Sequence, residues 1–295
     1  MMPFSPEPLS AGASAHLDEL QADVNTQVDR GIQYNCASRL WRGRKSGNNL
    51  EFWAEIGDKL AAKHPRLGLC QYCEYDRSSP TEHFFPQKHY PERTFRWDNY
   101  LLICAYCNSV CKGEKFAVFN PNGSSSVFHL PITRRTYPIP PTDDAVLINP
   151  RTEDPQSFII IDVVTGMFLP TPGTDARGKE KAAYTIDLLH LNSNDNLVRY
   201  RRKAHEGYVQ KLEEYVKVQA ALDYPTLLAS LAPAKRAIVV LQHPFTREKQ
   251  RILNLIKTDI LDDLFPTVWL EIKAQKDFFP IIAALFDAAP ETLHW

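Results

Sequence analysis

The sequence predicts an α+β protein, in which a compact metal-held module is embedded in a mainly helical chain with a small β-hairpin insertion. Three observations predict this class. Two Cys-x-x-Cys pairs, at positions 70–73 and 104–107, enclose short apolar pieces and clustered aromatic residues. Apolar residues recur at spacings of three and four on both sides of this region, which is the period of an amphipathic helix. Two short apolar runs flank the turn at residues 164–166, as in a β-hairpin.

Length and composition place the chain among ordinary globular proteins. Its 295 residues are 44% hydrophobic and 23% charged, and the formal net charge is −1, which excludes a disordered, collagen-like or polybasic chain. At about 150 residues per domain, this length predicts about two domains. No apolar run reaches the roughly 18 residues of a membrane-spanning helix. Residues 1–15 lack the basic and apolar parts of a secretory signal, so we expect a flexible leader and a cytoplasmic protein.

Four segments are predicted along the chain. Residues 1–66 form the leader and an N-terminal helical segment, and residues 67–120 form the metal-held module. Residues 121–180 are rich in proline and glycine and contain the hairpin, and residues 181–295 form a C-terminal helical domain. The expected elements are helices over 17–28, 50–62 and 197–222 and around 251–265 and 281–286, and strands over 158–163 and 167–169.

The four paired cysteines predict a structural zinc site. Each pair lets two thiolates converge on one ion, and two pairs close a tetrahedral zinc site that has no open position. In a chain without an export signal, this spacing indicates metal binding rather than disulfides. The expected ligands are Cys70, Cys73, Cys104 and Cys107. Cys111 is the alternative to Cys107, and Cys36 is expected to be an inert buried thiol.

The motifs between and after the cysteine pairs resemble the HNH endonucleases. These motifs are Glu82-His83, Asn99 and Asn108. They stand where that family has an acidic residue with a histidine, a middle asparagine, and a last histidine or asparagine. The resemblance covers about residues 69–116 and implies a ββα-metal module of the treble-clef-like, zinc-knuckle type.

The resemblance implies a role for each of these residues. Glu82 and Asn108 offer hard oxygen ligands that suit a catalytic Mg²⁺ or Mn²⁺. His83 is then the base for water, since an unperturbed imidazole, with a pKa of about 6.5, is largely neutral near pH 7. Asn99 braces the loop through side-chain hydrogen bonds and does not contact the metal. The implied reaction is hydrolysis of a nucleic-acid phosphodiester, with DNA as the first expectation and RNA as the second.

Basic residues near these motifs predict contacts with phosphates, with simple solubility as the alternative. They are Lys88, Arg93, Arg96, Lys112 and Lys115. His89 is expected either near the metal or phosphate or as a solvated loop histidine. A second basic cluster in the long helix faces nucleic acid, a partner or solvent, and consists of Arg199, Arg201, Arg202 and Lys203.

Flanking motifs narrow the resemblance to the HNH subunit of Septu-type and retron-associated anti-phage systems, over roughly residues 69–205. The motifs are Cys70-Gln71-Tyr72-Cys73-Glu74, Glu82-His83-Phe84-Phe85-Pro86, Trp97 with Asn99, Lys112-Gly113-Glu114-Lys115-Phe116, Leu147-Ile148-Asn149-Pro150 with Glu153-Asp154-Pro155, and residues 189–197 before Arg199. In that family the nuclease works beside an ABC or SMC-like ATPase. The resemblance therefore implies such a partner, with the helical parts of the chain as its docking surface.

The chain departs from the family's pattern at two places. Gln87 stands where the family commonly has a lysine, and Lys88 follows it. The usual Cys-Asn-x-x-Lys is one residue longer here, because three residues separate Asn108 from Lys112. Two other functions stay open on the sequence. One is a non-catalytic zinc-knuckle module that binds nucleic acid or protein, and the other is an HNH nuclease of the restriction, homing or repair type.

Overall fold

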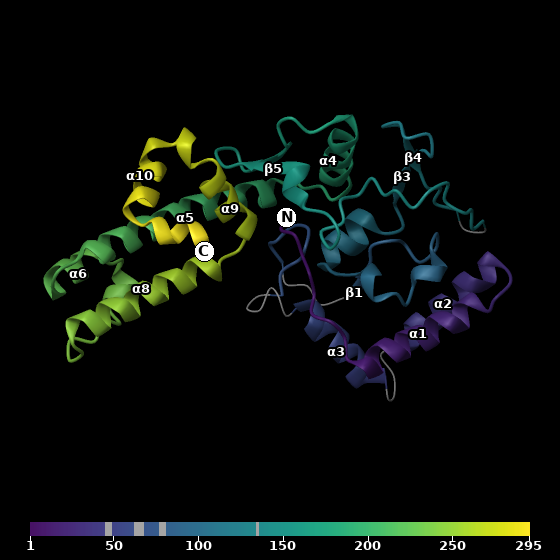
Figure 1. Cartoon of the computed structure of the whole chain (residues 1–295), viewed down its shortest axis with the longest axis horizontal. Helices are drawn as coiled ribbons and strands as arrows, with labels where there is room; N and C mark the ends of the chain where they lie inside the picture. The colour runs from purple at the N-terminus through teal and green to yellow at the C-terminus, as the bar shows by residue number, and fades with distance from the viewer. Residues whose placement is uncertain (45–48, 62–67, 77–80, 134–135) are drawn as a thin grey trace. The chain divides into compact units, whose positions relative to one another are not determined.

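The computed structural model describes residues 1–44, 49–61, 68–76, 81–133 and 136–295 (Figure 1). The chain forms two compact units. Unit 1 comprises Met1–Ile160 and Phe168–Leu197, and unit 2 comprises Ile161–Met167 and Val198–Trp295. Helices predominate, and the described part contains three small two-stranded sheets. This architecture is consistent with the predicted α+β class, whereas the division into four segments stays a prediction.

Three helices open unit 1: α1 (Ala11–Asn25), α2 (Arg30–Gly43) and α3 (Asn49–Ala61). The side chains of Ser10 and Asp29 accept hydrogen bonds from backbone N–H groups in the first turns of α1 and α2. These bonds satisfy donors that a helix start otherwise leaves unpaired, so the two residues define where the helices begin. α3 confirms the helix predicted over residues 50–62 as far as Ala61, and residue 62 lies outside the described part of the chain.

The flexible leader predicted over residues 1–15 is wrong. α1 begins within it, and Phe4 is 3% exposed in the same apolar cluster as Leu17. Burial of a phenylalanine side chain contributes about 1.5–3 kcal/mol, which accounts for the attachment of this segment to unit 1. The helix predicted to reach residue 28 ends at Asn25, and Val28 beyond it is fully exposed.

A short antiparallel pair carries the first candidate residues. Its strands are β1 (Thr81–His83) and β2 (Tyr100–Leu102), and in their register His83 lies opposite Tyr100. One apolar cluster contains residues of β2 and of all three N-terminal helices, so the helices and the strand pair share a core. Its buried members are Phe4, Leu17, Val24, Ala37, Ile56, Leu60, Phe95, Tyr100 and Leu102.

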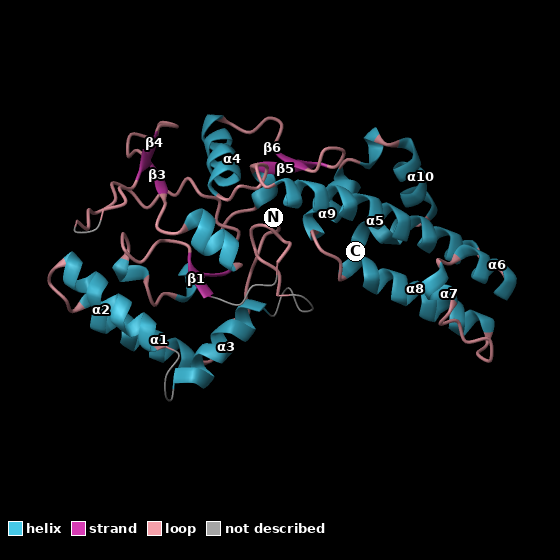
Figure 2. Ribbon diagram, turned by 180° about the vertical axis from the view of Figure 1, so that it is seen from behind, coloured by secondary structure: helices cyan, strands magenta, loops and turns pink. Residues whose placement is uncertain are grey.

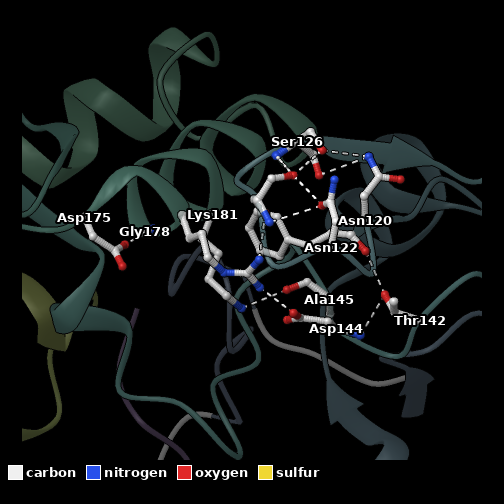
Figure 3. A network of polar contacts seen from close by, with 12 residues as sticks. Asn120, Asn122, Ser126, Thr142, Asp144, Ala145, Asp175, Gly178 and Lys181 are labelled. Carbon is white, nitrogen blue, oxygen red and sulfur yellow. Dashed lines mark hydrogen bonds and ion pairs between the residues drawn. The ribbon is translucent and has the colours of Figure 1, made fainter.

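A second antiparallel pair, β3 (Ala117–Phe119) and β4 (Val127–His129), lies beside helix α4 (Ala176–Leu188). Polar contacts join the helix to the loops around the strands, as Figure 3 shows. Arg177 of α4 donates to the carbonyl of Ser124, in the loop between the two strands, at 2.9 Å. This bond fixes the strand pair against the helix within unit 1.

The third sheet is formed by β5 (Ile159–Asp162) and β6 (Met167–Pro170), which confirm the predicted hairpin. Gly166 in its turn has φ of +74°, and a Cβ there would meet the carbonyl of Val198 at 2.6 Å. The turn therefore requires glycine. Arg201 donates to the Gly166 carbonyl at 2.6 Å and is 1% exposed. This member of the second basic cluster is thus buried and is not a surface cation.

Unit 2 is helical outside the hairpin turn. Its helices, labelled in Figure 2, are α5 (Asp195–Ala220), α6 (Tyr224–Ser230), α7 (Pro233–Arg236), α8 (Phe245–Leu261), α9 (Pro266–Ala274) and α10 (Pro280–Ala288). α5 confirms the long helix predicted over residues 197–222, and α8 and α10 overlap the two helices predicted after it. Among the described helices, none is both long and apolar enough to cross a membrane.

A buried carboxylate attaches α8 to the loop before it. The side chain of Glu248 has 0% exposure, and its oxygens accept hydrogen bonds from Val240 N at 2.9 Å, His243 Nδ1 at 2.8 Å and Arg251 Nε at 3.0 Å. These bonds, with that from Arg251 the strongest, lower the pKa of Glu248 to about 2. A carboxylate that is more acidic in the folded state stabilises the fold while it is ionised.

Acidification is therefore expected to destabilise unit 2 through Glu248. Its contribution is complete above the ordinary pKa of 4.5 and is lost as the pH falls toward 2. The shift corresponds to at most about 3 kcal/mol. We expect the unfolding free energy of wild type, measured by urea titration in the full chain, to fall more steeply between pH 4.5 and 2 than that of Glu248→Gln. Parallel slopes for the two proteins would contradict this prediction.

Candidate functional site

Four buried cysteines from the two predicted pairs converge in unit 1 and could hold one metal ion. The sulfur atoms of Cys70, Cys73, Cys104 and Cys107 all lie within 4.8 Å of one another, and those of Cys73 and Cys104 are 3.8 Å apart. In a tetrahedral site with zinc–sulfur bonds of about 2.3 Å, the sulfurs lie about 3.8 Å apart. Hydrogen bonds from Cys107, Cys70 and Cys73 lower the pKa of the Cys104 thiol.

The other two cysteines lie outside this group. Cys111 is completely buried, and burial raises the pKa of its thiol. Cys36 is half-buried on α2. Among the described residues, the metal-binding group contains Cys107 and not Cys111, so the geometry favours the first of the two ligand sets considered from the sequence.

Serine substitutions separate the two ligand sets. We expect Cys107→Ser to lose bound zinc and to melt at a lower temperature, because a missing thiolate leaves a three-ligand site, and structural zinc contributes folding free energy directly. Cys111→Ser is the matched control, since it removes a buried thiol from the same helical segment. Zinc per chain, measured by mass spectrometry of the purified proteins, decides between them. Equal zinc loss in both variants would contradict the assignment.

Glu82 and His83 are adjacent on β1 and have different environments. His83 is 5% exposed, and its Nε2 lies 2.9 Å from the carbonyl oxygen of Thr94. A carbonyl can only accept a hydrogen bond, so Nε2 carries the proton and Nδ1 keeps its lone pair. Burial lowers the pKa of His83 to about 4. The imidazole is therefore neutral near pH 7, as a base for water must be.

An aromatic residue of α2 covers this histidine. The ring centroid of Trp41 is 4.2 Å from that of His83, and Tyr100 lies on another side at 5.5 Å. The guanidinium carbon of Arg44 in turn lies 4.0 Å from the Trp41 ring centroid. His83 is thus enclosed by aromatic rings that belong to α2 and β2.

Asn99 makes the kind of contacts expected of a loop brace. Its Oδ1 accepts from Phe85 N at 2.7 Å, and its Nδ2 donates to the carbonyl of Arg93 at 2.9 Å and to that of Phe85 at 3.2 Å. The side chain is 2% exposed. These bonds connect the segment that follows β1 with the one that precedes β2, and the two strands are thereby held in register.

A π-helical segment, η3 (Tyr106–Lys112), follows β2 and carries Asn108. The N–H of Gly113 donates to the carbonyl of Asn108 at 2.6 Å, which closes a turn of five residues instead of the four of an α-helix. Lys112 is the last residue of this segment, and its bonds to Glu82 and His83 show that the wide turn leaves it beside β1.

Lys112 points inward and is completely buried. Its Nζ donates to Glu82 Oε1 at 3.0 Å and to the carbonyl of His83 at 2.8 Å. Lys112 is therefore not a surface cation, and its contact with a phosphate stays a prediction. A buried ammonium needs acceptors, and β1 supplies them.

The other residues that were predicted to contact phosphates differ in their exposure to solvent. Lys88 is 7% exposed, and its Nζ donates to Glu114 at 3.0 Å and to the carbonyl of Thr133, so it too is paired and enclosed and is not a surface cation. Arg93 is half-buried and forms an ion pair with Asp143. The exposed members of the set are Arg96 and Lys115.

His89 is fully buried, so the alternative of a solvated loop histidine is wrong. In the described part of the chain, neither ring nitrogen has a hydrogen-bond partner. Burial lowers the pKa of His89. His89 is absent from the metal-binding group found among the described residues, and its relation to a phosphate stays a prediction.

Sequence reasoning missed two neighbours of this site. Trp41 belongs to α2, which has no predicted counterpart, and no motif connects it with His83 forty-two positions later. Arg44 lies at the end of the same helix. The sequence contains Leu40-Trp41-Arg42 within a stretch long enough for a helix. This pattern indicates a helix, but it does not indicate which residues the helix packs against.

Comparison with known proteins gives one distant relative and no family match. No model of a known protein family matches the chain. Over 180 residues the chain is 28% identical to the Septu protein PtuB of Bacillus thuringiensis. The aligned region covers 59% of this chain and 55% of that protein, so the chain spans about half the length of its relative. The similarity supports a distant relationship with a Septu protein.

Proposed function

We propose that this protein is a metal-dependent HNH endonuclease that hydrolyses phosphodiester bonds of nucleic acid. The observation that carries the proposal is the arrangement around β1 and β2. A neutral His83 and a carboxylate of Glu82 lie on β1, and the next helical segment, which bears Asn108, is bonded to β1 through Lys112. Two strands followed by a helical segment, beside a four-cysteine group, support a ββα-metal module.

The donor set suits a hard divalent cation. Among the described residues, the second carboxylate oxygen of Glu82, Oε2, has no hydrogen-bond partner, and the side chain keeps 16% exposure. Asn108 is half-buried on η3 and offers an amide oxygen. Such oxygens are the ligands of Mg²⁺ and Mn²⁺, whereas the four thiolates suit zinc. A bound Mg²⁺ or Mn²⁺ would stabilise negative charge on the phosphate and the leaving oxygen.

The chain's own residues account for the remaining steps. The hydrogen bond from Nε2 to Thr94 fixes the His83 ring and leaves Nδ1 to take a proton from the attacking water. Because burial keeps this imidazole neutral, it is in the required protonation state near pH 7. Exposed Arg96 and Lys115 are available for phosphates of the nucleic acid. Asn99 holds the loop between the strands and takes no part in proton transfer.

The distant relationship to a Septu protein supports a role in anti-phage defence. The motif resemblance further implies an ABC or SMC-like ATPase partner, which would bind the helical parts of the chain. DNA is the first candidate substrate and RNA the second. A nuclease of the restriction or repair type fits the same site, and co-purification of an ATPase would argue against it.

Cleavage by matched variants tests the proposal. We expect wild type to cut labelled plasmid DNA or total tRNA with Mg²⁺ or Mn²⁺, alone or with a co-purifying ATPase, and to stop cutting in EDTA. His83→Ala removes the base and is expected to reduce the rate by about 10²- to 10⁴-fold. His129→Ala, at an exposed position on β4, is the control and keeps the wild-type rate. Failure of the zinc-loaded wild type to cut either substrate would favour a non-catalytic binding module.

The adjacency of Cys107 and Asn108 gives a second test. The cysteine group fixes the backbone one residue from a proposed ligand, so we expect Cys107→Ser to lose cleavage together with zinc, while Cys111→Ser keeps both. Rates and zinc content are measured on the same samples. Full cleavage by Cys107→Ser without bound zinc would contradict the predicted dependence of cleavage on the cysteine group.

A further inference from the structure

We propose that Lys112 is a positioning residue that orients the Glu82 carboxylate for a divalent cation; this inference rests on the proposed function. Lys112 Nζ donates to one carboxylate oxygen, Oε1, at 3.0 Å, and in the described part of the chain the other oxygen, Oε2, is unpaired. The ammonium therefore holds the carboxylate at one oxygen and leaves the second for the cation. Ligating carboxylates in metal sites are commonly fixed in this way by an outer hydrogen bond.

The burial of Lys112 makes this contact specific. The side chain is 1% exposed, against 16% for Glu82. A buried ammonium is costly unless it is hydrogen-bonded, and its bonds to charged acceptors are the strong ones. Its second acceptor is the carbonyl of His83 at 2.8 Å. One side chain thus fixes both the carboxylate of Glu82 and the backbone of the proposed base.

The π turn places Lys112 within hydrogen-bonding distance of the Glu82 carboxylate. The turn is closed by the hydrogen bond from the N–H of Gly113 to the carbonyl of Asn108. Lys112 is the last residue of the segment before Gly113, and its ammonium is bonded to β1. A π turn takes one more residue than an α turn. The wide turn therefore leaves Lys112 on the side of the segment that faces Glu82. Val110, within the turn, is 63% exposed and carries none of these contacts.

Mn²⁺ binding by the zinc-loaded full chain is the direct test, since the electron paramagnetic resonance signal of free Mn²⁺ reports affinity without any cleavage. We expect Lys112→Met to weaken Mn²⁺ binding by about 10- to 100-fold, and Lys112→Arg to restore part of it. Lys181→Met is the matched control. Lys181, drawn in Figure 3, is also buried, and it donates to the carbonyl of Ala145 at 2.8 Å and lies 2.7 Å from Glu153. Its loss is expected to leave Mn²⁺ affinity unchanged.

A second variant covers the case in which Lys112→Met does not fold, as judged by lost zinc. Insertion of one alanine between Ser109 and Val110 keeps every side chain but moves Lys112 along the turn, and it is expected to weaken Mn²⁺ binding as well. Wild-type affinity in the folded Lys112→Met or in the insertion variant would overturn the positioning role and leave the nuclease proposal standing. Wild type that binds no Mn²⁺, or binds it no better than Glu82→Gln, would overturn both.

Discussion

The convergence of four cysteine sulfurs is the contact on which the candidate site depends. The strands beside it have three residues each, which is too short to hold their own register in water. The first cysteine pair is bonded to β2 through Gln71, whose N–H donates to the carbonyl of Leu102 at 3.0 Å and whose Oε1 accepts from Leu102 N at 3.1 Å. The second pair begins the segment that bears Asn108. Both cysteine pairs are therefore attached at the C-terminal end of β2.

Burial and neighbouring charges both affect the protonation of His83 on β1. Burial is the main cause that lowers the pKa of His83; the charges of Lys112 and Arg44 lower it further, while Glu82 and the hydrogen bond to Thr94 partly raise it. A protonated imidazole beside two cations would add repulsion in a region of low solvent access. A neutral His83 avoids this repulsion, while Lys112 finds its counter-charge in Glu82.

Much of the fold and of the site follows from local pattern. The Cys-x-x-Cys spacing and the apolar periods of α3 and α5 are properties of neighbouring residues, and these elements could be predicted. The direction of a long side chain depends on tertiary packing. Sequence therefore placed Lys112 and Lys88 on a basic surface, whereas both point inward to acceptors from distant segments. The burial of Phe4 was missed for the same reason, because its partners come from elsewhere in the chain.

The π turn also affects how relatives of this chain are compared. Both ends of the turn are fixed in space, by the cysteine group before Asn108 and by the bonds of Lys112 after it. Because both ends are fixed, one more residue between them would displace the side chain of Asn108 or of Lys112. Residues equivalent to Lys112 in other proteins with such a turn are therefore recognised by the acceptors that they reach, as well as by their place in the sequence.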